Sequence, residues 1–247
     1  INLSSYRNSG YIQYSKDIGN FSLTSGFRGN YWSLNEELIL SPRVSVSCIP
    51  NWERDVVFKG AAGIYYQPAF YRELRDFNGN INQNIKAQKS THYILGADYL
   101  FYAWNRPFKW VSELYYKNLE NLIPYKVDNV RIRYLPSELS NGYAIGLDMK
   151  INGEFVPGIE SWASLSVMKT EEDIIGDYYT DENGDIKEAG YIPRPTDQRV
   201  NFSLYFQDYI PNNPSYKMHL NLIYGTGLTF GPPKSEKQQD ILRIPSY

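Results

Sequence analysis

The chain has 247 residues and a formal net charge of −2, and it contains no run rich in Lys or Arg. This balance excludes the basic surface on which nucleic-acid binding depends, so we expect no nucleic-acid partner. Tyr occurs 23 times, aromatic residues make up 16% of the chain, and 14 Pro and 18 Gly accompany them. That composition favours strands and turns over helices.

Alternation of apolar and polar residues predicts ten strands, because a period of two gives a strand one apolar and one polar face. In the second of these strands, for example, Leu23 and Phe27 lie opposite to Arg28. In chain order the predicted strands are Ser5–Lys16, Phe21–Trp32, Pro42–Ile49, Val56–Tyr66, Ser90–Tyr102, Phe108–Leu119, Gly142–Ile151, Ser161–Thr170, Gln198–Tyr209 and Tyr216–Leu228.

The connections between the predicted strands alternate in length. In an up-and-down meander every second connection returns to the same end of the sheet, so tight turns gather at one end and long loops at the other. Outer-membrane barrels have this asymmetry. The short connections are Asp17–Asn20, Pro50–Asp55, Trp104–Pro107, Asn152–Glu160 and Ile210–Ser215, and the long ones are Gln67–Lys89, Asn121–Asn141 and Glu171–Asp197.

The apolar strand faces are compatible with two environments. A soluble sandwich buries them against a second sheet, whereas a transmembrane barrel turns them to lipid. Aromatic positions favour the barrel, since Trp and Tyr prefer membrane interfaces. We expect an aromatic girdle at the short-turn end, made of Trp52, Trp104, Trp110, Trp162, Tyr209 and Tyr216, with Trp32 towards the long-loop end.

Four segments follow one another along the chain in an order that is informative. They are SPRVSVS at Ser41–Ser47, GIYYQPAFYREL at Gly63–Leu74, IKAQKSTHYILGADY at Ile85–Tyr99 and YIPRPTDQRVNFSLYFQDY at Tyr191–Tyr209. Together they resemble the barrel of TonB-dependent outer-membrane receptors, particularly those of Bacteroidetes.

The resemblance implies an all-β, antiparallel up-and-down transmembrane β-barrel of the 22-strand type, of which this chain holds about ten strands. Residues 1–247 are then expected to be a portion of that barrel, with the plug domain and the final strands in the rest of a larger chain. The resemblance also implies the cell outer membrane as location.

The implied activity is the import of a scarce nutrient that the extracellular loops capture. Passage is then driven by the TonB complex acting through the plug domain. Outer-membrane lipid and lipopolysaccharide are implied partners, and a surface lipoprotein is compatible with the family. The nutrient stays open, because siderophore, cobalamin, glycan and peptide importers share the barrel.

For ligand capture we single out aromatic and arginine residues of two long loops, because Tyr and Arg combine contact area with directed hydrogen bonds. Loop-to-loop packing and contact with lipopolysaccharide phosphates are the competing interpretations. The candidates are Tyr66, Phe70, Tyr71, Arg72 and Arg75 in one loop and Arg131, Arg133 and Tyr134 in the other. The inward residues expected to meet the plug or lumenal water are Arg28, Arg199, His219 and Asn221.

The sequence contains few residues that could form a disulfide, a metal site or a catalytic site. A single Cys excludes an internal disulfide, and two His do not make a multi-ligand zinc site. The segment Tyr178–Gly190 partly imitates a calcium loop but lacks the ligands at both ends. Asn183-Gly184 is better interpreted as a hairpin tip, and so is Asn78-Gly79. We expect no enzyme, no cofactor and no metal.

Two alternatives to the receptor remain. A soluble β-sandwich that binds a ligand such as a glycan predicts two inner faces packed together. A small outer-membrane barrel enzyme of about ten strands predicts that the first strand pairs with the last. It also predicts acidic or His side chains clustered at the loop end.

Overall fold

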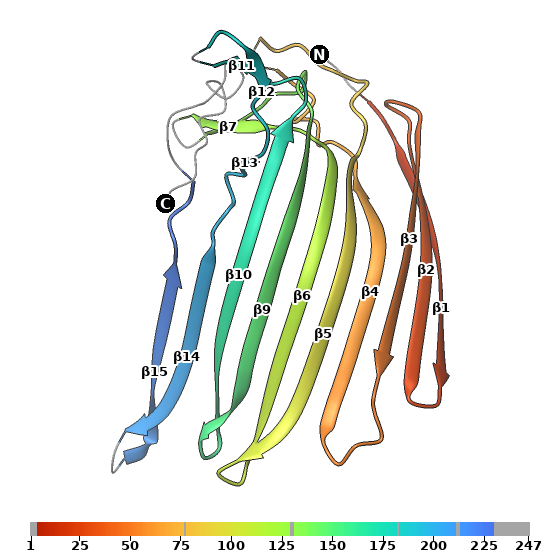
Figure 1. The fold of residues 1–247 in the computed structure, drawn as a ribbon. Coiled ribbons are helices and arrows are strands. Elements are labelled where there is room, and N and C mark those ends of the chain that lie inside the picture. Colours follow the sequence, from red (N-terminus) through yellow and green to blue (C-terminus); the bar gives the residue numbers. More distant parts are fainter. Residues whose placement is uncertain (1–3, 77, 129–130, 182, 211–212, 230–247) are drawn as a thin grey trace.

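A computed structural model of the chain describes residues 4–76, 78–128, 131–181, 183–210 and 213–229. Within them the main sheet is antiparallel, and its ten long strands follow the chain up and down (Figure 1). In sheet order they are β1 (Arg7–Ile18), β2 (Phe21–Trp32), β3 (Glu37–Cys48), β4 (Asp55–Gln67), β5 (Gln88–Ala103), β6 (Arg106–Leu122), β9 (Ser140–Val156), β10 (Ile159–Ile174), β14 (Val200–Ile210) and β15 (Asn213–Gly225).

The remaining strands are short and lie at the long-loop end. β7 (Tyr125–Asp128) pairs with β8 (Arg131–Tyr134), and β11 (Tyr178–Thr180) pairs with β12 (Ile186–Glu188). β13 (Ile192–Pro193) adds two residues to the margin of β10. None of the described residues forms a helix that is long and apolar enough to span a membrane.

All ten predicted strands are confirmed. The largest boundary differences lie at β3, which begins at Glu37 instead of Pro42, and at β9, which ends at Val156 instead of Ile151. Pro has no N–H for a ladder and is normally restricted to edges and strand starts. Pro42 fits this rule because β3 pairs with β4 only from Arg43 onward, opposite Gly63. The first half of β3 is therefore an edge on the side of β4.

The strand registers divide the sheet into two faces. Leu23, Val46, Leu95, Leu114 and Val167 belong to one continuous cross-strand row, which also contains Lys16, Gly60, Leu147 and Val200. Leu95 and Leu114 are 65% and 50% exposed. The predicted alternation is thus confirmed, and no described element covers this apolar face.

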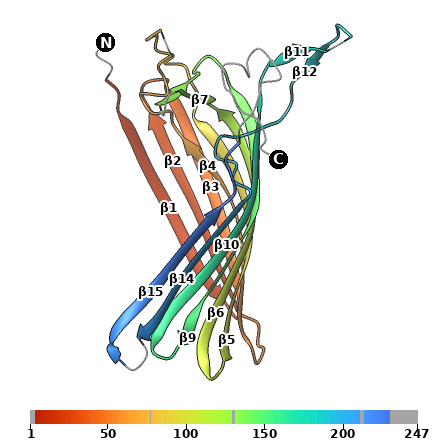
Figure 2. The same ribbon diagram turned by 90° about the vertical axis from the view of Figure 1, so that its left-hand side faces the viewer.

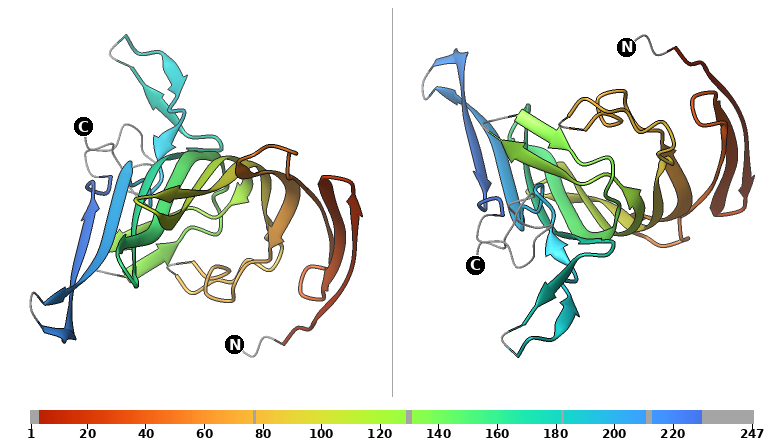
Figure 3. Two further views of the ribbon diagram at one scale, coloured as in Figure 1. Left: turned by 90° about the horizontal axis from the view of Figure 1, so that it is seen from below. Right: turned by 90° about the horizontal axis from the view of Figure 1, so that it is seen from above.

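The opposite face is polar and concave. Figure 3 shows the sheet as an arc when viewed along its strands, with β1 and β15 as its two separate edges. These two strands do not pair with each other in the described part of the chain, and both are exposed along their whole length. The closure that a self-contained ten-stranded barrel needs is therefore not found there.

Turn lengths follow the predicted asymmetry with one exception. Tight connections at residues 19–20, 49–54, 104–105 and 157–158 share one end, and the long connections 68–87, 123–139 and 175–199 share the other (Figure 2). The turn between β14 and β15 lies outside the described residues. The exception is residues 33–36, a short connection at the long-loop end that results from the early start of β3.

The expected aromatic girdle is only partly correct. Trp52 and Trp104 are exposed at the short-turn end, and Trp110 lies in register with Tyr99 on the apolar face. Trp162, in contrast, pairs with Tyr205 on the polar face, where their rings stack at 6.1 Å. Its position in β10 was predicted correctly, but the register turns its side chain inward.

The buried core lies at the long-loop end instead of between two layers. Trp32, only 1% exposed, packs with Leu74 and Ile85 of the long β4–β5 connection. Asn35 holds the same connection by donating a hydrogen bond to the Ile85 carbonyl at 2.9 Å. The long loops are thereby fixed against the concave face, next to the upper parts of β2 and β3.

We predict that Trp32→Ala releases the β4–β5 connection, because truncating a buried Trp costs about 3–5 kcal/mol. Trypsin should then cleave the full-length protein after Arg72 and Arg75 several-fold faster than in the wild type, as measured by peptide mass spectrometry. Trp104→Ala, which removes a turn residue that is 73% exposed, is the control and should leave cleavage unchanged. Equal cleavage of all three proteins would contradict this account of the core.

Candidate functional site

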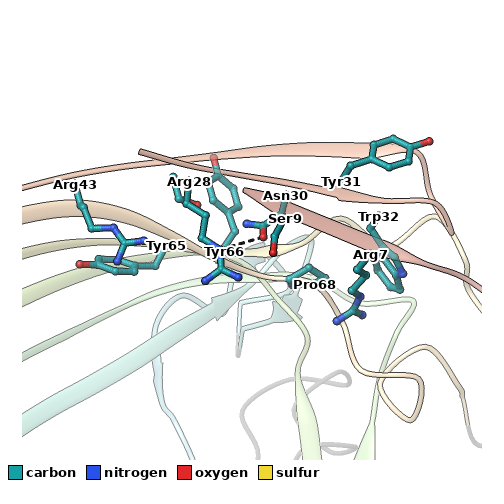
Figure 4. A pocket seen from close by; sticks show the side chains of 11 residues that line it. Arg7, Ser9, Arg28, Asn30, Tyr31, Trp32, Arg43, Tyr65, Tyr66 and Pro68 are labelled. Atoms are coloured by element: carbon teal, nitrogen blue, oxygen red, sulfur yellow. Dashed lines mark hydrogen bonds between the residues drawn. The ribbon is translucent and has the colours of Figure 1, made fainter. Parts of the chain in front are cut away.

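A cavity of about 360 Å³ opens on the concave face near the long-loop end. Three arginines, Arg7, Arg28 and Arg43, line it together with Trp32 and Tyr65. Figure 4 shows that the three arginines extend to the same side of the sheet, whereas the nearby Tyr31 extends away. We call this cavity the arginine pocket.

The pocket exists because two neighbouring strands separate. The β3–β4 ladder ends at the pair Arg43 and Gly63. Beyond it, the first half of β3 pairs only with β2, while residues 64–67 of β4 pair with β5. Pro42 lies at the point of separation and has no N–H with which to extend the ladder.

Arg7 is the most firmly held of the three arginines. Its guanidinium carbon lies 4.3 Å from the centroid of the Trp32 ring, and its Nη2 donates to the Ala69 carbonyl at 2.9 Å. Cation–π contacts of this kind stabilise by about 0.5–2 kcal/mol. Arg7 therefore connects the sheet to the β4–β5 connection as well as lining the pocket.

Arg43 lies between two glycines, because its cross-strand neighbours are Gly26 on β2 and Gly63 on β4. A Cβ atom at Gly63 would lie 3.1 Å from the Arg43 Cβ and 3.0 Å from the Tyr65 Cε2. The absence of side chains at both neighbours gives Arg43 the space to extend towards Tyr65, whose ring centroid is 5.9 Å from its guanidinium carbon.

Arg28 makes one hydrogen bond inside the pocket, from its Nε to the Asn30 Oδ1 at 3.2 Å. Among the described residues, no carboxylate forms an ion pair with Arg7, Arg28 or Arg43. The pocket therefore concentrates three positive charges beside aromatic rings. Such a combination suits an anion with a flat face.

The positive character continues along the sheet. Arg43, Gly63, His92 and Lys117 form one cross-strand row on the polar face. The rings of Tyr65 and His92 lie 4.5 Å apart, and the His92 Nε2 is 2.7 Å from the Ser90 hydroxyl. His92 thus supports the Tyr65 side of the pocket.

The predicted capture residues are partly brought together. Tyr66 lines the arginine pocket. The Tyr71 hydroxyl is 2.7 Å from the Ser5 hydroxyl, which accepts a hydrogen bond from the Trp32 Nε1. The guanidinium carbon of Arg72 lies 5.5 Å from the centroid of the Tyr134 ring, so the two loops contact each other.

The other predicted residues do not join this arrangement. Phe70 is exposed, Arg75 lies in a bridge with Ile81 near the tip of its loop, and Arg133 is exposed on β8. Arg131 begins β8, and its side chain lies outside what the structure describes. Phe70, Arg75 and Arg133 thus do not line the pocket.

The inward residues divide in the same way. Arg28 lines the pocket, whereas Arg199 forms an ion pair with Asp197 at 2.8 Å. His219 lies 6.0 Å from the Tyr205 ring, on the polar face that it shares with Asn221. Sequence reasoning missed Trp32, Arg43 and Tyr65 as site residues. Their positions on polar faces near the long-loop end were the available signal, but their proximity depends on strand register.

The calcium-like segment forms the hairpin tip that was expected. Asp181 accepts hydrogen bonds from the backbone N–H groups of Asn183 and Asp185, and its other oxygen pairs with Lys187. The bond from Lys187 lowers the pKa of the Asp181 carboxyl. Gly184 at the tip has a φ of 87°, which favours glycine. No group of three or more His, Cys, Asp or Glu with metal-binding geometry occurs in the described ranges.

Comparisons with known proteins give no further guide, since no family model, curated protein or solved structure matches the chain.

We predict that Gly63→Ala destabilises the sheet at the pocket, because the added Cβ meets the fixed Cβ of Arg43. Overpacking of this kind costs about 1–3 kcal/mol. The matched control is Gly60→Ala on the same strand, where the nearest atoms lie at an ordinary 3.5 Å. Thermal unfolding followed by circular dichroism should show a lower midpoint for Gly63→Ala only. Equal midpoints for the two variants would contradict the close approach.

Proposed function

We propose that this sheet is part of the transmembrane β-barrel of a TonB-dependent outer-membrane receptor. Such a receptor imports a scarce nutrient by capturing it at the long-loop end and passing it through the lumen. The observation that carries the proposal is an uncovered apolar face opposite a concave polar face. The resemblance of four sequence segments to this family supports the same function.

The exposed apolar face would be costly in water. Burial of a Leu or Val side chain is favourable by about 1.5–3 kcal/mol, and soluble proteins rarely expose apolar patches larger than a few hundred Å². The row that includes Leu23, Val46, Leu95, Leu114 and Val167 crosses most of the sheet. Lipid is the environment in which such a surface is stabilising.

Strand length is suited to the same environment. A tilted transmembrane strand needs about 9–11 residues. The shortest of the ten long strands is β14 with 11 residues, and the longest, β6 and β9, have 17. Antiparallel ladders also pair the backbone groups of neighbouring strands, as hydrocarbon requires, and the interruption between β3 and β4 lies towards the long-loop end.

The sandwich alternative is less well supported. It needs a second sheet against the apolar face, and the other sheets in the described part of the chain are the two-stranded pairs β7–β8 and β11–β12. Both belong to the long connections. A glycan-binding role would also leave Leu95 and Leu114 without a partner surface.

In the proposed receptor the work is selective binding and gated passage, without covalent chemistry. The long loops and the arginine pocket lie at the end that faces the outside of the cell. Outer-membrane lipid would contact the apolar face, and lipopolysaccharide would contact its outer margin. The TonB complex would act through a plug domain, and a surface lipoprotein would dock on the loops where one is used.

We predict that Leu95→Arg prevents stable insertion, because an arginine facing lipid near the middle of a strand costs about 2–4 kcal/mol. The matched control is Ile94→Arg, whose side chain lies on the polar face one residue away. Each full-length variant is produced in a Gram-negative host, and the folded fraction in outer-membrane vesicles is measured by heat-modifiable gel mobility. Leu95→Arg should lose most of the folded species and Ile94→Arg should retain it.

The same pair of variants distinguishes the alternatives. In a water-soluble protein Leu95→Arg would replace an exposed apolar residue by a charged one and would leave folding intact. Equal folding of both variants, or recovery of the full-length protein from the soluble fraction, would refute the membrane assignment.

A further inference from the structure

We propose that the arginine pocket binds a small polyanion with a flat, unsaturated face, of the polycarboxylate class. The binding itself follows from the pocket, whereas the identification of this anion as the imported nutrient rests on the function proposed above. The inference concerns a site inside the concave face. It differs from the loop residues that the sequence favoured.

The first argument is charge. Arg7, Arg28 and Arg43 line one cavity of about 360 Å³, and no described carboxylate pairs with any of them. Like charges gathered without counter-charges repel each other and lower stability. An anion bound among the three arginines offsets this repulsion, and the relief of repulsion favours binding.

The second argument is that two acids at the long-loop end, Glu37 and Glu73, accept hydrogen bonds from the loop. Glu37 accepts hydrogen bonds from the Asn35 side chain at 3.1 Å and from the Ala87 N–H at 2.9 Å. Glu73 accepts one from the Phe70 N–H at 2.8 Å and is buried. These carboxylates hold the long loop in place, and neither forms an ion pair with an arginine of the pocket in the described part of the chain.

The third argument is donor geometry. Planar guanidinium groups bind carboxylates through two parallel hydrogen bonds, and Arg28 uses only its Nε within the pocket. Arg43 rests near the Tyr65 ring without a carboxylate partner. The terminal nitrogens of both arginines are therefore available to separate carboxylates of one ligand.

The fourth argument is the aromatic walls. The rings of Tyr65 and Trp32 lie on the same side of the sheet as the arginines and line the same cavity (Figure 4). Aromatic rings favour flat ligand surfaces, and tyrosine hydroxyls add directed hydrogen bonds. A ligand that combines several carboxylates with a planar body satisfies both features, whereas inorganic phosphate would leave the rings unused.

The test uses the purified full-length protein and 1,3,5-benzenetricarboxylate as the probe. Binding is measured by titration calorimetry and by quenching of tryptophan fluorescence. The neutral analogue 1,3,5-benzenetrimethanol, which has the same ring without charges, is the ligand control. We expect the tricarboxylate to bind, the neutral analogue not to bind, and affinity to fall as salt is raised.

Arg28→Gln and Arg43→Gln should each weaken binding of the tricarboxylate about tenfold, the ratio that corresponds to the loss of one charge-assisted hydrogen bond. The matched control is Arg54→Gln, which removes the same charge from an exposed turn at the opposite end of the sheet. Arg7 is not used, because it also holds the β4–β5 connection. Circular dichroism verifies that each variant is folded.

Three outcomes would overturn the inference. They are absence of tricarboxylate binding, equal binding of the neutral analogue, and equal weakening by Arg54→Gln. If the Gln variants instead loosen a plug domain towards protease while the wild type binds no tricarboxylate, the arginines serve that domain and the inference also fails. Binding by a protein that is absent from the outer membrane would refute the proposed function and leave the anion site standing.

Discussion

The antiparallel ladder is the interaction on which the rest of this structure depends. Ten long strands are held edge to edge without a second layer behind them, and the buried cluster around Trp32 lies at one end of the sheet. A ladder of this kind assigns alternate side chains to opposite faces, so one surface collects Leu and Val and the other collects Arg, Lys, Ser and Asp. Stability then depends on the medium that meets the apolar surface, because no protein element among the described residues buries it.

The candidate site lies where that ladder is interrupted. At Pro42 the strands β3 and β4 cease to pair, and the space between them becomes the arginine pocket. Glycines on both sides of Arg43 then leave space for its side chain to extend over Gly63 towards Tyr65 on the same face. Local departures from the rules of strand composition are expected at functional sites, and here a proline and two glycines together create the cavity.

The sequence was sufficient to predict where the strands lie, but it was not sufficient to predict which side chains meet in the pocket. Alternation is a local signal that each strand carries in full, so the ten strands and the asymmetry of their connections were predictable. Contacts between elements depend on register and on loop packing. The approach of Arg43 to Tyr65 requires the pairing of β3 with β4, and that of Arg72 to Tyr134 joins two loops that are distant in sequence. Trp162 shows a different limit. Its place beside a short turn suggested the girdle, whereas its period-two spacing with Ser164 and Ser166 assigns its side chain to the polar face.

Charged residues along the concave face differ between the level of the arginine pocket and the levels nearer the short-turn end. This difference bears on the proposed passage of a ligand through the lumen. Four residues below the row of Arg43, His92 and Lys117, a second row contains Lys59 on β4 and the direct cross-strand neighbours Glu113 and Asp148 on β6 and β9. At about 3.3 Å per residue the two rows are about 13 Å apart. In the proposed receptor, an anion would be attracted to the arginine pocket and opposed by Glu113 and Asp148 on the way to the short-turn end. Capture at the pocket is favourable by itself, whereas onward movement needs a rearrangement that supplies free energy. An energy-coupled importer of the kind proposed above would require this order of events.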